Sequence, residues 1–579
     1  MKSEIFEISF KAGMNAILSN KKEENGVTVY NYKLSWTKEN ALQDDEFTFK
    51  TYTPLVGIMY GFHPKCGNER NINPDWSGFV NHSIANGAPV NCFYDGQSKN
   101  KFTIALSEAK MLTRLKGGIV EENGEVEIKF TMGTRQFTEK YETTLSIYID
   151  KRDIYVFEAL KDVSLWWESL GMKPHFVPES AKEPVYSFWY SFHQVVNEHN
   201  VEEECKRAKE AGFNVCIVDD GWQTSDGNRG YAYCGDWEPF DGKFPDMAAH
   251  VKRVHDIGMK YVLWYSVPFV GTFTKAYEKF NTMFLRANHR ANEFVLDPRY
   301  KEVREYLLDK YVKALTQWKL DGFKLDFIDS WYDDVRNAPY NEKMDIPSLQ
   351  DAVDVFMTTT INKLTEIKPD ILLEFRQSYI GPHMRKFGNM FRVGDCPGDY
   401  IRNRIGAFDL RMLMGDSPVH SDMLMWHKDE SAEKDALQII SILYTVMQYS
   451  AKLDSLNDKT RKMSLFYLNF MNEKRETLLS GDLRPYDPHM NYTWAESVKG
   501  GENIAAVYLE DKCIAPEKKE KMYIVNGTTA NRVLLELEGE FKVKIMNCCG
   551  EVISKETKLL SGVNLLPIPS GGMAELISL

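Results

Sequence analysis

The middle of the chain alternates short apolar runs with stretches of helical periodicity, and this alternation constrains the fold most. Each run is rich in Val, Ile and Phe, and an amphipathic segment follows it. The pattern predicts parallel strands, because a parallel pair needs a long connection that is usually a helix. We predict strands over 185–190, 214–218, 260–265, 322–327, 371–375 and 390–393, and helices over 201–211, 247–257, 301–317 and 348–365.

The number of these units favours a closed barrel over an open sheet. Six or more strand–helix units over about 300 residues are typical of a (β/α)8 barrel, also called a TIM barrel. The apolar segment 437–448 and the helical pattern over 459–479 would supply the last units.

Both flanking regions are typical of β structure. Apolar or alternating runs separated by turn residues occur at 27–34, 102–106, 126–131 and 141–149, and again at 504–509, 521–525, 533–537, 541–546 and 565–568. The proline-bearing stretch 171–184 predicts a linker. We therefore expect a multidomain chain with an N-terminal β-sandwich over 1–170, a catalytic barrel over 171–484 and a small C-terminal β-sandwich over 485–579. The length of 579 residues agrees, because single cores stop growing well below that size.

Charge and motif content exclude several classes of protein. The 71 Lys and Arg residues against 83 Asp and Glu residues give a net charge of −12, which argues against a nucleic-acid partner or an anionic membrane surface. The sequence has no signal-like start and no long apolar run, so we expect a cytoplasmic protein without a membrane segment. The nine scattered cysteines form no C-x-x-C pair, and the histidines show no metal-ligand spacing. We expect reduced thiols, no metal and no cofactor.

Polar residues follow five consecutive predicted strands of the barrel. A barrel enzyme builds its active site at the carboxyl ends of its strands. An aspartate at such an end often caps the next helix, but five coincidences favour a shared site. The residues are Asp219 and Asp220, Trp264, Lys324 and Asp326, Glu374 and Arg376, and Arg392 and Asp395.

Carboxylates from different strands, with aromatic residues among them, indicate glycoside chemistry. One carboxylate attacks the anomeric carbon, and a second protonates the leaving oxygen. Trp222, Trp237 and Trp264 would form apolar walls for sugar faces, or else fill the barrel core. The sequence leaves both interpretations of the tryptophans open.

These segments and their order resemble the clan of α-galactosidases and α-N-acetylgalactosaminidases, especially glycoside hydrolase family 36. The resemblance covers about residues 180–485. The flanking regions resemble the family only in being a large N-terminal and a small C-terminal β-sandwich. The segments that resemble the family are Asp219-Asp220-Gly221-Trp222, Gly235-Asp236-Trp237, Lys243-Phe244-Pro245, Leu296-Asp297-Pro298, Lys324-Leu325-Asp326, Gly394-Asp395, Val419-His420-Ser421 and Gln448-Tyr449-Ser450.

The resemblance implies catalytic roles for two aspartates. Asp326 would be the nucleophile and Asp395 the general acid/base. Lys324, two residues before Asp326 and so on the same strand face, would help keep Asp326 ionised. Burial and a neighbouring carboxylate such as Asp399 would raise the pKa of Asp395, as an acid requires.

The resemblance also implies residues that bind the sugar. Asp219 and Asp220 would accept the 4- and 6-hydroxyls, and Lys324 would bind the 3- and 4-hydroxyls. Arg392 and Asp399 would contact the 2-hydroxyl region. Trp222 and Trp264 complete the predicted substrate-binding set, together with Arg376.

The fifth strand departs from the family pattern. The family usually has a cysteine and a Ser/Gly-rich turn there, whereas this chain has Glu374-Phe375-Arg376-Gln377. The strand-six segment, which begins at Gly394 and ends at Asp399, is one residue longer between its two aspartates. These departures leave the 2-substituent of the sugar and the leaving group open.

The sequence predicts a retaining glycoside hydrolase that removes terminal α-galactosyl or related residues from oligosaccharides or glycoconjugates. The alternatives are an α-N-acetylgalactosaminidase, another α-glycosidase or a transglycosylase on the same barrel. A carbohydrate-binding protein on a degenerate barrel is the alternative that is not an enzyme. The expected partners are an oligosaccharide or glycoside substrate and, because family relatives often assemble, a second copy of the chain.

Overall fold

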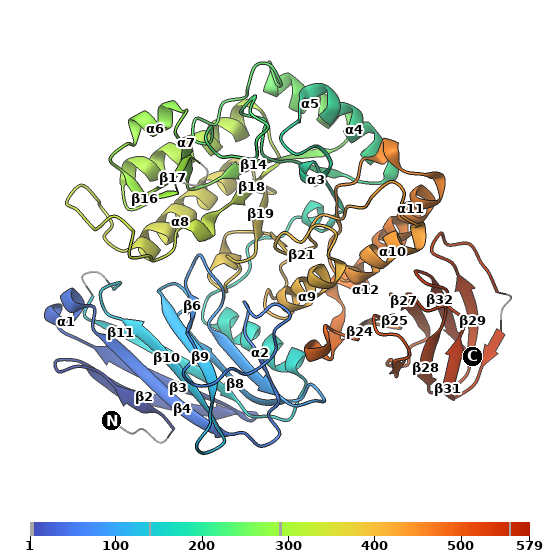
Figure 1. Cartoon of the computed structure of the whole chain (residues 1–579), viewed down its shortest axis with the longest axis horizontal. Coiled ribbons are helices and arrows are strands. Elements are labelled where there is room, and N and C mark those ends of the chain that lie inside the picture. Colours follow the sequence, from blue (N-terminus) through green and yellow to red (C-terminus); the bar gives the residue numbers. More distant parts are fainter. Residues whose placement is uncertain (1–4, 138–139, 289–291, 555–556) are drawn as a thin grey trace.

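The computed structural model describes residues 5–137, 140–288, 292–554 and 557–579. Within these ranges the strands form six sheets, and the three largest regions follow one another along the chain. Two antiparallel sheets come first, a parallel barrel with its helices lies in the middle, and a smaller β region ends the chain (Figure 1).

The barrel confirms the predicted fold class. Its strands are parallel and lie in chain order, with the last strand beside the first. Parallel bridges between His420 and Val446 and between Leu424 and Tyr449 join the two remaining edges. The strands are β12 (Val185–Ser187), β13 (Val215–Val218), β14 (Lys260–Ser266), β18 (Gly322–Asp326), β19 (Leu372–Arg376), β20 (Met390–Arg392), β21 (Val419–His420) and β22 (Gln448–Tyr449).

The first barrel strand is shorter than predicted. It ends at Ser187, and helix α3 (Trp189–Phe192) follows. The backbone amides of Tyr190 and Ser191 donate to Ser450 Oγ at 3.0 and 3.1 Å instead of joining a strand ladder. The chain therefore turns across the end of the barrel at this point.

Helices lie around the barrel, close to the predicted positions. Each amphipathic segment has an apolar face that a strand layer can cover. The pattern over 459–479 forms two helices rather than one, with Lys474 between them. The helices are α4 (Glu198–Ala211), α5 (Met247–Ile257), α7 (Lys301–Gln317), α8 (Leu349–Ile367), α9 (Tyr400–Arg411), α10 (Ala432–Ser441), α11 (Asp458–Glu473) and α12 (Arg475–Ser480).

A small antiparallel insertion between β14 and α7 was not predicted from the sequence. It contains β15 (Phe269–Gly271), β16 (Phe284–Asn288) and β17 (Glu293–Leu296), with helix α6 (Lys275–Lys279) between the first two. Strands this short carry too few residues for a periodic signal.

The N-terminal region is a β-sandwich whose two sheets share one apolar core. Phe49 stacks on Phe130 within one sheet, with ring centroids 4.8 Å apart, and meets Tyr32 of the other sheet at 5.3 Å. One sheet contains β1 (Glu7–Ser9), β4 (Glu46–Pro54), β10 (Glu125–Gly133), β9 (Thr113–Val120) and β6 (Val80–His82). The other contains β2 (Asn15–Glu24), β3 (Val27–Ser35), β11 (Glu142–Asp150), β8 (Asn100–Leu106), β7 (Val90–Tyr94) and β5 (Tyr60–Phe62).

Helix α2 (Val156–Ser169) is a feature that the sequence analysis missed, because it treated this stretch as the end of a strand-rich region. The helix buries Leu160, Val163 and Trp167. The Trp167 indole donates to the carbonyl of Leu106 at 2.9 Å, which ties the helix to β8.

The C-terminal region pairs a larger sheet with a smaller one over a common core. Ile524 and Phe541 of the larger sheet pack in the same cluster as Leu535 of the smaller sheet. The larger sheet contains β23 (Asp482–Tyr486), β24 (Trp494–Lys499), β25 (Glu502–Val507), β27 (Lys521–Asn526), β32 (Met573–Ser578), β29 (Phe541–Met546) and β30 (Thr557–Leu559). The smaller contains β26 (Cys513–Ile514), β28 (Val533–Leu537) and β31 (Gly562–Leu566). The domain limits at 170/171 and 484/485 stay a proposal.

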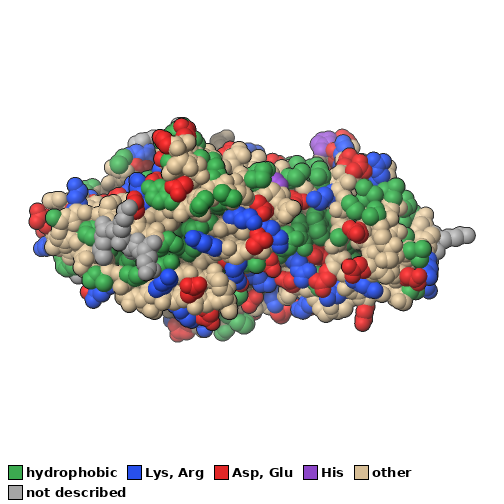
Figure 2. Space-filling model, turned by 90° about the horizontal axis from the view of Figure 1, so that it is seen from below, with side chains coloured by type: hydrophobic (Ala, Val, Ile, Leu, Met, Phe, Trp, Pro, Cys, Tyr) green, Lys and Arg blue, Asp and Glu red, His purple; other side chains and the backbone are tan. Residues whose placement is uncertain are grey.

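The surface mixes charges of both signs. Figure 2 shows Asp and Glu side chains interspersed with Lys and Arg side chains on one face of the molecule. Among the described residues, no helix combines the length and the apolar character needed to cross a bilayer.

Candidate active site

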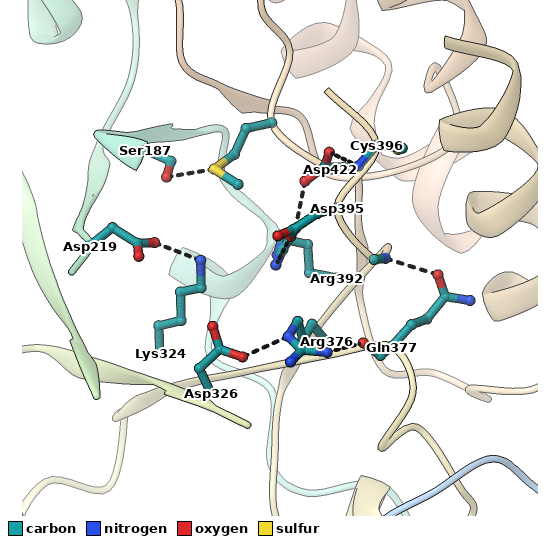
Figure 3. Close-up of polar contacts among 12 residues, drawn as sticks. Ser187, Asp219, Lys324, Asp326, Arg376, Gln377, Arg392, Asp395, Cys396 and Asp422 are labelled. Carbon is teal, nitrogen blue, oxygen red and sulfur yellow. Dashed lines mark hydrogen bonds and ion pairs between the residues drawn. The ribbon is translucent and has the colours of Figure 1, made fainter. Parts of the chain in front are cut away.

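The carboxyl ends of the barrel strands bring charged side chains from distant parts of the sequence together. Asp219 follows β13, Lys324 and Asp326 lie on β18, and Arg376 and Arg392 end β19 and β20. Figure 3 shows these side chains pointing toward a common centre, with Asp395 beside them. The predicted strand-end cluster is therefore formed in space.

Asp326 is held by three donors. Its Oδ1 accepts from Arg376 Nε at 2.6 Å and from the Phe327 amide at 2.8 Å. Its Oδ2 accepts from the Trp264 indole at 3.0 Å. Burial opposes ionisation of this carboxylate, but Arg376 and Lys324 outweigh burial and hold the pKa of Asp326 well below its usual range. Asp326 is therefore a buried carboxylate that stays ionised.

Arg376 lies between two carboxylates. Besides Asp326 it binds Asp329 Oδ2 at 3.2 Å through Nη1, and the same nitrogen donates to the carbonyl of Gln377 at 2.6 Å. Its guanidinium carbon lies 5.1 Å from the centre of the Phe327 ring. Arg376 thus contacts the predicted nucleophile directly, and its contact with a substrate stays a prediction.

Asp395 differs from Asp326 in exposure and in partners. Its side chain is 56% exposed, and Oδ1 accepts from Arg392 Nη2 at 2.8 Å. Arg392 lowers the pKa of Asp395 and outweighs the opposing effect of burial. The expectation of a raised pKa was wrong.

Asp399 does not supply the expected neighbouring charge. It is exposed, and it caps α9 by accepting a hydrogen bond from the Arg402 amide at 2.9 Å. Asp399 stands one residue further from Asp395 than in the family pattern. At this position it is the N-cap of α9, which begins at Tyr400. The structure shows Asp399 as a helix cap, and its contact with the 2-hydroxyl region stays a prediction.

Arg392 connects three carboxylates beneath the mouth of the barrel. It is 1% exposed, and it binds Asp422 at 2.5 Å as well as Asp395. Glu374 lies 3.5 Å from it, and burial raises the pKa of that glutamate. Arg392 lowers the pKa of Asp395, as expected of a residue that tunes it, and its contact with the 2-hydroxyl region of a sugar stays a prediction.

Asp422 is a buried member of the site that the sequence analysis missed. It accepts from the Tyr190 hydroxyl at 2.9 Å and from the Cys396 amide at 2.7 Å. Its signal was its position, directly after the predicted seventh-strand turn that ends at Ser421. Asp422 thereby ties the seventh strand to the segment that carries Asp395.

Asp219 and Asp220 have different environments. Lys324 Nζ lies 2.6 Å from Asp219 Oδ2, so these two form a buried pair beside Asp326. Asp220 accepts from the amides of Gln194 at 2.6 Å and Gln223 at 2.7 Å, and burial raises its pKa to about 6. Contacts of these residues with sugar hydroxyls stay predictions.

Trp222 is a core residue, which corrects its assignment to the sugar site. It is fully buried, and its indole donates to the carbonyl of Trp264 at 3.0 Å. Its ring packs against Tyr265 and Trp318 at 5.4 and 5.9 Å. Trp264 is 1% exposed and supports the Asp326 carboxylate, so its role as a sugar wall stays a prediction.

A cavity of about 640 Å³ opens beside Asp395, the predicted acid/base group, and beside Arg376, the partner of Asp326. Arg376, Asp329 and Asp395 line it, together with Gln377 and Ser378. Among the described residues, no group of three His, Cys, Asp or Glu side chains is arranged to hold a metal ion. The site can therefore combine an ionised carboxylate and a second, exposed carboxylate next to a space for a substrate.

Comparison with known proteins identifies the domain. The family model described as Melibiase matches residues 172–378. Residues 172–378 form a Melibiase domain. The match begins just before the barrel and ends directly after β19. It therefore includes Asp219, Lys324, Asp326 and Arg376.

Curated relatives of the Melibiase domain carry the name α-galactosidase. Mel36A of Lactobacillus acidophilus is 28% identical over 199 residues, which cover 32% of this chain and 26% of Mel36A. AgaA of Geobacillus stearothermophilus is 25% identical over 146 residues, which cover 24% of this chain and 20% of AgaA. The matched segments thus span about a quarter or less of these relatives.

Solved structures share the whole architecture around the Melibiase domain. The family 36 α-galactosidase AgaA superposes with a TM-score of 0.64 at 12% identity, covering 100% of this chain and 88% of AgaA. The galactosidase domain of AgaSK gives a TM-score of 0.66 at 13% identity, covering 98% of this chain and 80% of that chain. At this identity the likeness shows the fold.

The core position of Trp222 yields a stability prediction. We expect Trp222→Ala to lower the free energy of unfolding by about 3–5 kcal/mol, because truncating a buried aromatic leaves a cavity. Urea unfolding measures the loss. Trp76→Ala is the matched control, since Trp76 is 75% exposed and surface changes stay within about 0.5 kcal/mol. Equal, small losses in both variants would overturn the core assignment of Trp222.

Proposed function

We propose that the chain is a retaining glycoside hydrolase that removes terminal α-galactosyl or related residues from oligosaccharides or glycoconjugates. The observation that carries the proposal is the contrast between Asp326, which is buried and held ionised, and Asp395, which is exposed to the cavity. A nucleophile needs the first environment, and an acid/base group that meets a leaving group and then water needs the second. The Melibiase match and the α-galactosidase relatives support this class of reaction.

The first step would form a covalent intermediate. An oxygen of Asp326 attacks the anomeric carbon while the bond to the leaving oxygen breaks, and Asp395 gives that oxygen its proton. Oδ2 is the better candidate for attack, because it accepts one hydrogen bond whereas Oδ1 accepts two. Trp264 and Arg376 fix the orientation of the carboxylate.

The second step would return both aspartates to their starting states. Asp395 takes a proton from water, and the resulting hydroxide attacks the anomeric carbon and releases Asp326. The negative charge of Asp326 raises the pKa of Asp395, although Arg392 has the larger, opposite effect. When Asp326 becomes a neutral ester, this raising effect disappears, so Asp395 becomes a stronger acid and is present as the carboxylate that the base role requires.

The substrate is proposed from the relatives. Structures of AgaA variants contain raffinose and stachyose. We therefore propose an α-galactosyl group on a saccharide, and a panel of aryl α-glycosides would separate this from an α-N-acetylgalactosaminide or another α-glycoside. A homo-oligomer and a cytoplasmic location also remain proposals, which light scattering and cell fractionation test.

The nucleophile assignment predicts the effect of one substitution. Asp326→Ala should reduce turnover of an activated aryl α-galactoside by about 10⁴-fold or more, because no covalent intermediate can form. Asp334→Ala is the matched control, as it removes a carboxylate from the same segment that pairs with Arg336 outside the site. Full activity of Asp326→Ala would falsify the assignment.

The acid/base assignment predicts a dependence on the leaving group. Asp395→Ala should slow substrates with poor leaving groups most, because a good leaving group departs without a proton. Azide should restore turnover of the activated substrate, since it needs no general base to attack the intermediate. Rates are compared over a series of aryl α-galactosides of increasing leaving-group pKa. An equal loss across the series would assign the acid to another residue.

The Arg376–Asp326 contact predicts a change in the pH profile. The reaction needs Asp326 ionised, so kcat/KM falls when pH drops below the pKa of Asp326. Arg376→Gln removes a cation that lowers this pKa, and the acidic limb should move to higher pH by about 1–3 pH units. Asp329→Asn is the comparison variant, because it leaves the Arg376–Asp326 pair in place. The acidic limb of the Asp329→Asn profile should stay in place or move to lower pH. An acidic limb that does not move in Arg376→Gln would contradict the role of Arg376.

A further inference from the structure

The cavity beside Asp395 has one wall from outside the barrel. Asn68 and Gly67 belong to the loop after β5 of the N-terminal sandwich, and they line the cavity opposite residues of the barrel. Arg402, from the first turn of α9, lines it on the barrel side. The space next to the acid/base group is therefore an interdomain space.

A buried ion pair holds the N-terminal loop in this position. The Arg70 guanidinium lies 2.8 and 3.0 Å from the two oxygens of Asp409 on α9, and the two side chains are 2% and 6% exposed. The hydroxyl of Tyr492, from the C-terminal region, donates to the same aspartate at 2.5 Å. A second contact joins the Gly87 amide to the Ser378 carbonyl at 2.7 Å. All three regions of the chain thus fix the wall that carries Asn68.

The groups on the walls are suited to hydroxyls. Asn68 and Arg402 are exposed, and in the described part of the chain their side chains make no hydrogen bond or ion pair with another residue. An amide and a guanidinium that meet no protein partner can bind the oxygens of a polyhydroxylated molecule. A lipid chain would leave both groups without partners, at a cost in free energy.

We infer that this interdomain space is the site of the leaving group, and that Asn68 and Arg402 recognise the hydroxyls of a sugar leaving group. The inference rests on the proposed function, because Asp395 must hand its proton to a leaving oxygen in this space. The Arg70–Asp409–Tyr492 contacts position the loop. The chain's own N-terminal sandwich thereby determines which glycosides are accepted.

The test compares two substrates that share a galactosyl group and differ in the leaving group. Asn68→Ala and Arg402→Ala should each lower kcat/KM for raffinose by about 3–10-fold, the loss of one hydrogen bond. For 4-nitrophenyl α-galactoside the change should stay within about twofold, because an aryl group offers few hydroxyl partners. Asn20→Ala is the control, since Asn20 is exposed on β2 away from this cavity. Equal effects on both substrates, or no effect on raffinose, would overturn the inference.

A binding measurement separates this inference from the proposed function. Calorimetry with raffinose on the Asp326→Ala variant needs no turnover. Addition of Asn68→Ala should weaken raffinose binding by a similar 3–10-fold, about one hydrogen bond, and unchanged or absent raffinose binding overturns the inference. A different outcome is that the wild type binds raffinose, with binding weakened by Asn68→Ala, and yet cleaves no α-glycoside. In that case the hydrolase proposal fails while the recognition site stands.

Discussion

Pairing of buried charges is the constraint on which the mouth of the barrel depends. Three cations alternate with carboxylates there: Lys324 with Asp219, Arg376 with Asp326 and Asp329, and Arg392 with Asp395 and Asp422. Removing one partner of such a pair leaves a charge buried without compensation, which costs far more than the pair itself contributes. Each of these pairs except Arg392–Asp395 joins different strands or their following loops, so the charges that would perform the chemistry also fix the strand ends.

The same network gives two aspartates different properties. Asp326 receives three hydrogen bonds in a buried position, whereas Asp395 has one cationic partner and a side chain that is 56% exposed. The buried environment of Asp326 favours a fixed, ionised carboxylate. The exposed environment of Asp395 lets its carboxyl group exchange protons with a molecule in the cavity. The lowered pKa of Asp395 favours the carboxylate form that the proposed base role requires, and it would make the proposed acid role depend on the charge of Asp326.

The sequence predicted the elements that depend on local pattern. Strand–helix alternation located the barrel, and the position of Asp326 and Asp395 at strand ends placed them at one mouth, because parallel strands end on the same side. Tertiary partners could not be predicted in this way. Arg70 and Asp409 lie 339 positions apart, and no local pattern links them.

The direction of Trp222 could not be predicted either, because it depends on the path of the chain just before it. Gly221 has a φ of +110°, and a Cβ there would lie 2.4 Å from the Cα of Gln194. This close approach turns the chain so that the indole enters the core. A tryptophan after a strand end carries no sequence signal that distinguishes this path from one into the cavity.

Arg376, where the fifth strand departs from the family pattern, links the proposed nucleophile Asp326 to the cavity. It binds Asp326 and Asp329 at once, so one cation faces two carboxylates while the enzyme is free. Formation of the ester would neutralise Asp326 and leave Arg376 paired with Asp329 alone. In the intermediate, the negative charge of Asp329 would balance the positive charge of Arg376. The buried guanidinium would therefore keep one carboxylate partner. In the proposed reaction, an anionic group on the substrate would compete with these carboxylates for Arg376 and meet Asp395 nearby, so the proposed substrate is a neutral sugar.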